Sequence, residues 1–536
     1  MNAEPDPGIS SSSLRGDSAP ASQAEGRDLG MALHPEQEAA PQGSLGARAT
    51  AGAAWIFVET GFVQGLAFVV FAVIARYVTA ADVGLISITF IITQGARMLL
   101  FDGIATAVSR KPSPTAIEFT TGFWIMIANA TIATALIVVA APALQAAFAA
   151  PGLQRVVELM SITVMMYGIS SMQETWLLRH FHFKALALRA IIASLAGAGV
   201  GVALAFKNFG VVALVSQQLV MMAVNAALLW VACPWKPALR FSRPIAREIV
   251  AFAVGLFPSR FIGMVNQNCD TILVGILFGP ASVGIYNVAK RARLAVQLVA
   301  WGPINGVVLP MFAELQADPA RFKRGVLTSL AIVSAFCTPL FFGLGAISHD
   351  AVLAVFGSRW TAAAPVLAIL AFGGFAAVLA SVNDSIFMTL GRPAVCSFAA
   401  VLYVVLAVPL FVYFREWPSL PFALPFVLPY CFLFPAYIWL CRRFTEIPVL
   451  AWVQSVFPSM LAGVVMFCAV RLLLGALPAL PLAARLLIAS GSGAAIYVAA
   501  LYVLDRPTWL MTYDFAYRGT RKLRRAPPVQ VSVSPL

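Results

Sequence analysis

Apolar runs of about 20 residues recur along most of this chain, and they restrict its fold more than any other feature. A helix of about 20 apolar residues can cross the hydrocarbon core of a bilayer, which is about 30 Å thick. Only 11% of the 536 residues are charged, against roughly 25% in soluble domains, which is too few to cover a soluble surface. In lipid the backbone must satisfy its own hydrogen bonds, and these runs lack the alternation of barrel strands. The sequence therefore predicts an all-α polytopic membrane protein.

The apolar runs divide into fourteen predicted transmembrane helices. They cover residues 53–75, 83–106, 117–141, 156–177, 185–206, 210–232, 249–273, 283–307, 325–347, 362–389, 395–414, 420–440, 449–474 and 482–504.

Lysine and arginine are concentrated in alternate loops between these helices. The richer set includes Arg110 and Lys111, the stretch 236–247, and the basic C-terminal tail. Basic residues favour the cytoplasmic side of a membrane, so we expect both termini in the cytoplasm and an even number of helices. The net charge of +13 then reflects topology, and nucleic acid is not expected as a partner.

Composition also divides the chain into five predicted segments. Residues 1–48, rich in Pro, Ser, Gly and acidic residues, are expected to form a disordered cytoplasmic tail. An N-lobe of six helices follows, then a C-lobe of six, two extra helices and a basic cytoplasmic tail. These four segments cover 49–240, 241–445, 446–506 and 507–536.

One turn occurs twice in the sequence. The string ARYVTAADVGLISI (75–88) links the first two helices, and GILFGPASVGIYNV (275–288) links the seventh and eighth. Both place Val-Gly after a small-residue turn, and six helices separate them, so both turns face the same side. This pattern predicts two six-helix lobes in parallel repeat, related by a pseudo-twofold axis along the membrane normal, with the substrate site between them.

Several strings resemble the polysaccharide flippase (Wzx-like) branch of the multidrug/oligosaccharidyl-lipid/polysaccharide exporter superfamily. The first-lobe turn is joined, in order, by second-lobe strings over about 340 residues of similarity in all. These are NQNCDTILVGILFGPASVGIYNVAKR (266–291), VLPMFAELQADPARFKRG (308–325), VFGSRWTAAAPVLAILA (355–371) and LGRP (390–393).

This resemblance implies a function. Such proteins move undecaprenyl-diphosphate-linked sugar repeat units across the inner membrane, by alternating access, for exopolysaccharide or lipopolysaccharide synthesis. The implied partners are the lipid-linked oligosaccharide and, beside the protein, a polymerase and glycosyltransferases. A multidrug antiporter and a lipid II flippase share the superfamily fold and remain alternatives. A membrane polysaccharide polymerase or ligase is an alternative of a different class. Because the outward loops are short, an enzyme is not expected.

Ionisable residues inside membrane helices are candidates for substrate contact, since they are costly there. Arg97 and Arg260 lie well inside their helices, and a guanidinium presents the fork of donors that suits a diphosphate. The alternative for Arg97 is an ion pair with Asp102. Lys290 and Arg291 could extend this cationic surface, or could reach to the membrane interface as end-of-helix residues.

Three acidic residues are candidates for coupling to a proton or sodium gradient. Glu59 and Asp384 lie within predicted helices, and Asp270 shares a helix face with Asn266. Asp270 could instead be a helix-end hydrogen-bond partner, and Asp384 could join helices within the bundle. No metal-ligand spacing and no Walker A string occurs, so neither a metal nor any other bound cofactor is expected.

Overall fold

The computed structural model describes residues 45–416, 422–477 and 480–513. The chain forms two units, residues 1–48 and residues 49–536. Within the described ranges every regular element is helical, which confirms the predicted all-α class. Residues 1–44 of the predicted N-terminal tail and 514–536 of the C-terminal tail lie outside the described residues. The predicted lobe boundaries at 240/241 and 445/446 stay predictions.

Seven helices precede the long central one. They are α1 (Leu45–Ala75), α2 (Ala80–Leu100), α3 (Asp102–Ser109), α4 (Ala116–Ala147), α5 (Leu153–Arg179), α6 (Phe183–Phe206) and α7 (Val211–Ala232).

Local sequence sets several of these helix starts. Thr79 begins α2 with a capping box, in which its hydroxyl accepts from the Asp82 N–H and the Asp82 carboxylate accepts from the Thr79 N–H. Thr115 and Glu118 do the same for α4. Such caps satisfy backbone donors that a helix start leaves unpaired.

The central helix α8 (Arg243–Leu315) turns at Gly279, whose φ of 82° favours glycine. We call the parts before and after Gly279 its first and second halves; they correspond to the predicted helices 249–273 and 283–307. The remaining helices are α9 (Pro319–Ala346), α10 (Ser348–Val355), α11 (Ala363–Thr389), α12 (Pro393–Phe414), α13 (Leu424–Thr445), α14 (Val449–Ala476) and α15 (Leu482–Leu504), with the short η1 (Ser358–Trp360) before α11.

Twelve helices in the described chain are long and apolar enough to cross a membrane, so the count of fourteen is not confirmed. The first half of α8 and the second half as far as Ala300 form a single one of these twelve spans, Arg243–Ala300. The polar helix α5, which matches the predicted helix 156–177, is not among them. These two helices account for the difference.

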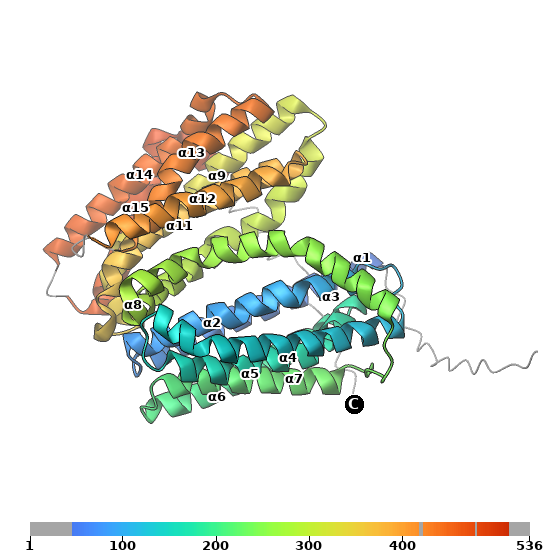
Figure 1. Ribbon diagram of the computed structural model, residues 1–536. Coiled ribbons are helices and arrows are strands. Elements are labelled where there is room, and N and C mark those ends of the chain that lie inside the picture. Colours follow the sequence, from blue (N-terminus) through green and yellow to red (C-terminus); the bar gives the residue numbers. More distant parts are fainter. Residues whose placement is uncertain (1–44, 417–421, 478–479, 514–536) are drawn as a thin grey trace, which may run out of the picture. The chain divides into compact units, whose positions relative to one another are not determined.

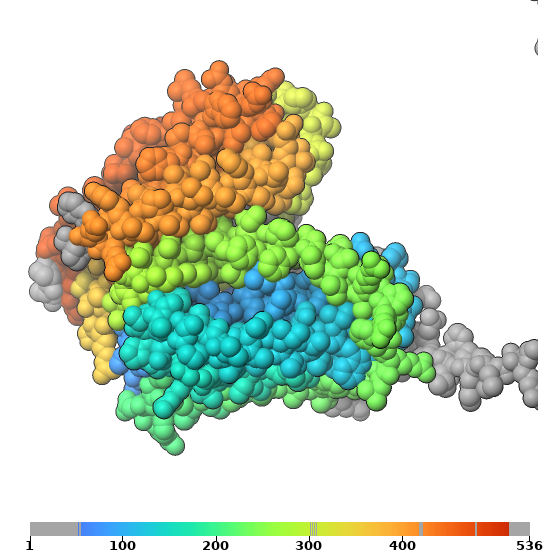
Figure 2. All heavy atoms as spheres, viewed as in Figure 1, coloured from blue at the N-terminus to red at the C-terminus, as the bar shows by residue number. Residues whose placement is uncertain are grey.

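Helix α8 packs on two groups of helices. The first group is α1–α7 and the second group is α9–α15. The neighbours of α8 include α2 and α3 from the first group and α11 and α12 from the second. Figure 1 shows α8 running between α2–α7 and the helices α11–α15. In the space-filling view, the first half of α8 and the helices beyond it are separated by a hollow (Figure 2).

The repeated turn forms a reciprocal contact where α2 crosses the second half of α8. A Cβ added at Gly84 would lie 1.8 Å from the carbonyl oxygen of Pro280, and one added at Gly284 would lie 1.9 Å from that of Ala80. Each glycine thus receives the turn carbonyl of the other copy. The two contacts agree within 0.1 Å, which is the relation that a pseudo-twofold axis between the repeats requires.

The same end of the bundle carries a second link between the groups. The Trp360 indole N–H donates to the Ala75 carbonyl at 2.8 Å, and both residues are buried. The Arg76 guanidinium donates to the Ala354 carbonyl at 2.8 Å, at the C-terminal end of α10, where the helix dipole favours a cation. We call this end, with the 75–80 turn, Gly279 and the segment 347–361, the turn end.

Candidate functional site

The first cluster joins α2, α3 and the first half of α8. The Arg260 guanidinium lies 3.9 Å from the Asp102 carboxylate, beyond hydrogen-bond distance, and both side chains are over one-third exposed. Asp102 also interacts electrostatically with Arg97. Arg97 itself lies over the Tyr167 ring, 4.0 Å from its centroid. Two guanidiniums therefore converge on one loosely held carboxylate in a partly open site, and Glu174 adds a second negative charge nearby.

The ion pair considered for Arg97 differs in the structure. Asp102 has its salt-bridge contact with Arg260, while Arg97 stacks on Tyr167 of α5. The Arg97 Nε has no hydrogen-bond partner among the described residues. The sequence could not supply this pairing, because Asp102 and Arg260 are far apart along the chain.

A second cluster lies in the first group of helices and was not predicted. The Arg189 guanidinium donates to Glu174 at 2.7 Å and to Asn225 at 2.6 Å, and Arg189 is buried. Glu59 interacts electrostatically with both Arg189 and Glu174. Arg189 falls inside the predicted helix 185–206. That position was the available signal.

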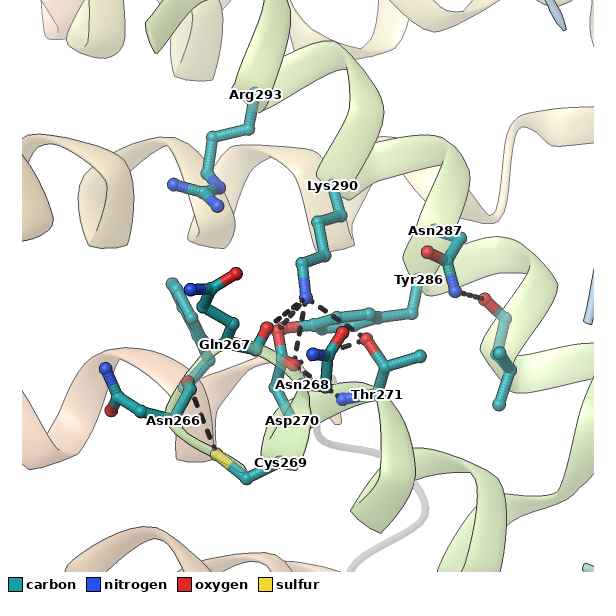
Figure 3. A network of polar contacts seen from close by, with 12 residues as sticks. Asn266, Gln267, Asn268, Cys269, Asp270, Thr271, Tyr286, Asn287, Lys290 and Arg293 are labelled. Carbon is teal, nitrogen blue, oxygen red and sulfur yellow. Dashed lines mark hydrogen bonds and ion pairs between the residues drawn. The ribbon is translucent and has the colours of Figure 1, made fainter. Parts of the chain in front are cut away.

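The third cluster joins the two halves of α8 near the turn end, and Figure 3 shows it. The Lys290 ammonium lies 2.8 and 2.9 Å from the two Asp270 carboxylate oxygens, and the Tyr286 hydroxyl donates to Asp270 at 2.7 Å. Lys290 also donates to the Thr271 hydroxyl and the Gln267 carbonyl. Asp270 is buried. The network ties the α8 hairpin together and occupies the donors of Lys290.

Two arginines near Lys290 lie differently. Arg293 is only 5% exposed, bonds Gln297 at 2.7 Å and makes no ion pair with a described residue (Figure 3). Its Nε has no partner there either. Arg291 is exposed and stacks on Phe71 of α1, 4.0 Å from the ring centroid. Arg291 is therefore the residue of this stretch that faces open space beside the first group.

Asp384 on α11 lies apart from these arginines. Its carboxylate accepts a hydrogen bond from the Tyr437 hydroxyl at 3.2 Å. No basic side chain in the described chain comes within ion-pair distance of it. Among the seven predicted site residues, the structure brings Arg97 and Arg260 together at Asp102 and joins Lys290 to Asp270. Glu59, Arg291 and Asp384 occupy separate places.

Metal chemistry finds no support in the described ranges. No group of three or more His, Cys, Asp or Glu side chains there is close enough to hold a metal ion. The seven cysteines are free.

A basic surface lies beside the start of α8. The Lys111 ammonium bonds Glu118 at 2.6 Å and Glu248 at 2.7 Å, and these bonds raise the pKa of Lys111. Arg243 and Arg247 are exposed on the same helix start and share a face. This end of α8 is opposite to the turn end.

The sequence of this chain is similar to those of known polysaccharide biosynthesis proteins. Residues 73–365 match the family described as "Polysaccharide biosynthesis protein". The teichuronic acid biosynthesis protein TuaB of Bacillus subtilis (strain 168) is 25% identical over 344 residues, 64% of this chain and 71% of TuaB. The succinoglycan biosynthesis transport protein ExoT of Rhizobium meliloti (strain 1021) is 24% identical over 481 residues, 89% of this chain and 97% of ExoT.

The fold of this chain is similar to that of a solved structure. The lipid II flippase MurJ, in an inward closed conformation, superposes with a TM-score of 0.65 at 14% identity. The match covers 85% of this chain and 99% of MurJ.

Proposed function

Because the chain belongs to the polysaccharide biosynthesis protein family, we propose that it is a non-enzymatic flippase for lipid-linked oligosaccharides. Its substrate is a sugar repeat unit on a polyprenyl diphosphate, and its product feeds exopolysaccharide or lipopolysaccharide synthesis. The protein lies in the inner membrane with both termini in the cytoplasm. A polymerase and glycosyltransferases act on the same lipid before and after it.

The placement of the Arg97 and Arg260 guanidiniums around one carboxylate, Asp102, is the observation that carries this proposal. Both guanidiniums converge on Asp102 and remain partly open, away from the turn end. A diphosphate can displace this carboxylate, because Asp102 at 3.9 Å makes no hydrogen bond to Arg260, whereas phosphate oxygens can accept charge-assisted bonds from a guanidinium in bidentate geometry. Arg291, on the second half of α8 and stacked on Phe71, adds a third cation.

Alternating access supplies the transport step. The groups are linked at the turn end by the Gly84 and Gly284 contacts and by the Trp360 bond. We propose that these links release when substrate is delivered to the periplasmic side, after it has bound from the opposite side. Without such a route, sugar hydroxyls and two charges would face hydrocarbon, at several kcal/mol for each unsatisfied group.

An ion gradient drives the cycle in this proposal, and two acids are the candidates for binding the ion. Asp384 has a hydroxyl donor and no basic partner within ion-pair distance in the described chain. Glu59 and Glu174 share one guanidinium, so one carboxylate is left without its own counter-charge. We favour a proton as the ion, because a single carboxylate such as Asp384, with a hydroxyl donor beside it and no basic partner in the described chain, can take up and release one.

The test is complementation of a strain deleted for this gene. The repeat-unit lipid in each leaflet and the exported polymer are measured for wild type, Arg97→Ala, Arg260→Ala and Arg260→Lys at equal membrane abundance. Arg155→Ala is the matched control, because Arg155 is exposed on the first turn of α5.

We expect both alanine variants to trap repeat units in the cytoplasmic leaflet, Arg260→Lys to export weakly, and the control to export normally. Normal export by both alanine variants would reject this site. Periplasmic repeat units in the deletion strain itself would reject the flippase function.

A further inference from the structure

An apolar cavity of about 300 Å³ lies between α2 and the first half of α8, beside the C-terminal end of α4. Ile88, Ile92 and Leu99 line it from α2, and Met264 and Ile272 line it from α8. All its lining residues except Thr271 are apolar. We call this cavity the α2–α8 groove.

The groove offers almost nothing to water. The Thr271 hydroxyl donates to Asp270 and accepts from Lys290, each at 3.2 Å, so its bonds are made outside the groove. An ordered water needs two to four polar partners, which this lining lacks. Hydrocarbon is therefore the chemistry that fits it.

The groove ends beside the arginine site. Arg260 precedes Met264 by four residues, so the two side chains lie one helical turn apart on the same face of α8. An apolar channel that begins at guanidinium groups complements a lipid with an anionic head.

The dimensions select one chain of one leaflet. From Arg260 to Thr271 α8 rises about 16 Å, which is about half of the hydrocarbon thickness. On α2 the lining runs from Ile88 to Leu99, also a rise of about 16 Å, so a volume of about 300 Å³ corresponds to a cross-section of about 19 Å², enough for one hydrocarbon chain.

We propose that the α2–α8 groove holds the first isoprenoid units of the substrate lipid while its diphosphate binds Arg260 and Arg97. This inference rests on the proposed function. Lipid already surrounds such a chain with hydrocarbon, so the groove adds position more than affinity. It directs the chain from the arginine site toward the turn end, as in a lipid of the cytoplasmic leaflet. Met264, flexible and set against Gly95, can adapt to the methyl branches.

The protein offers an internal control. A second apolar cavity, of about 340 Å³, lies between the second half of α8 and the helices α9, α10 and α11, with Phe68 as its one lining residue from α1, and includes Val296 and Ala295 in its lining. It begins next to Arg291 and is the pseudo-twofold counterpart of the α2–α8 groove. Ile92 and Val296 are both partly buried, so equivalent probes can be placed in the two cavities.

The test places the photo-crosslinking residue p-benzoylphenylalanine at Ile92 or at Val296 in the full-length protein in cells. Adducts formed on illumination are identified by mass spectrometry. We expect the polyprenyl diphosphate lipid at position 92 and not at 296, with the adduct lost when the initiating sugar-phosphate transferase is deleted. A phospholipid adduct alone at position 92, an isoprenoid adduct at 296 alone, or no lipid adduct would each overturn the inference.

Filling the groove gives an independent readout. Ala96→Phe should lower export about tenfold, a change of one order in the rate, while Ala295→Phe in the other cavity should leave it near wild type. Equal export by both variants would count against the groove. Loss of transport by the gene deletion, restored by wild type, tests the proposed function separately, because it does not depend on where the chain lies.

Discussion

The reciprocal contact at the turn end predicts the effect of adding one methyl group. In Gly84→Ala, the new Cβ would be placed 1.8 Å from the Pro280 carbonyl oxygen. Cβ atoms essentially never approach another heavy atom within 3.0 Å, so the two backbones must part by about 1.2 Å. The Trp360–Ala75 bond, now 2.8 Å, would be stretched past hydrogen-bond distance by a separation of that size.

The cost falls on the closed turn end and not on the helices themselves. Overpacking costs ~1–3 kcal/mol and a lost hydrogen bond ~1 kcal/mol, so the closed arrangement should lose about 3 kcal/mol. That corresponds to about a 100-fold change in the ratio of closed to open molecules. Alanine is a better helix former than glycine, so the fold itself should be kept.

Distances between spin labels at Lys207 and Arg359, introduced as unnatural amino acids, measure this change. Both residues are exposed at the turn end, one in each group of helices. We expect wild type to give a short distance and Gly84→Ala a longer one. Gly255→Ala is the control, because an added Cβ there meets nothing within 4 Å.

The symmetry of the contact sharpens the test. Gly284→Ala should match Gly84→Ala, since its Cβ would lie 1.9 Å from the Ala80 carbonyl oxygen. The double variant should add little, because one separation relieves both clashes. A wild-type distance in Gly84→Ala, or the same shift in Gly255→Ala, would refute the reasoning.

Three further predictions concern ion pairs. Lys290→Met should lower the free energy of unfolding by about 3–5 kcal/mol by leaving Asp270 buried without its cation, and the double variant with Asp270→Asn should recover most of the loss in a denaturation assay. The Lys323 ammonium lowers the pKa of Glu446 in the folded protein. This ion pair therefore stabilises the fold at pH values above the ordinary pKa of a glutamate, and the stabilisation is lost as the pH falls through the lowered pKa of Glu446. The difference in melting temperature between wild type and Glu446→Gln should vanish over that fall, whereas a constant difference would contradict the pairing. Asp350→Asn should loosen α15, which Arg485 ties to that buried carboxylate at 3.1 Å, and should speed hydrogen exchange in α15 before the other helices.

The helices could be predicted because their signal is local. Apolar runs, caps and turn residues fix where a helix starts, and the predicted bounds of α6 and α15 differ from the structure by at most two residues. The hairpin of α8 was also predictable, since Gly279 and Pro280 interrupt an apolar stretch. Helix α5 is long enough to cross a membrane, but it is too polar to be one of the twelve apolar spans. Its polar residues are buried in the interior of the first group of helices.

Side-chain pairing was not predictable, because it depends on which helices become neighbours. Asp102 is five residues from Arg97, yet its ion-pair contact is with Arg260, more than 150 residues away. The repeated turn indicated two related lobes, but not that each Val-Gly glycine would receive the other turn's carbonyl. The spacing of Asp270 gave no sign of Lys290, which reaches it only because the chain reverses at Gly279.

The reciprocal contacts, of Gly84 with Pro280 and of Gly284 with Ala80, have the form of a homodimer interface contained within one polypeptide. In an isologous interface one surface patch serves both partners, and here the two copies of one short string serve both sides. A side chain added at one glycine then presses on the carbonyl of the opposite copy, so a compensating substitution would have to lie about 200 residues away in the sequence. If the two six-helix lobes were separate chains, the turn of each would already fit against the glycine of the other.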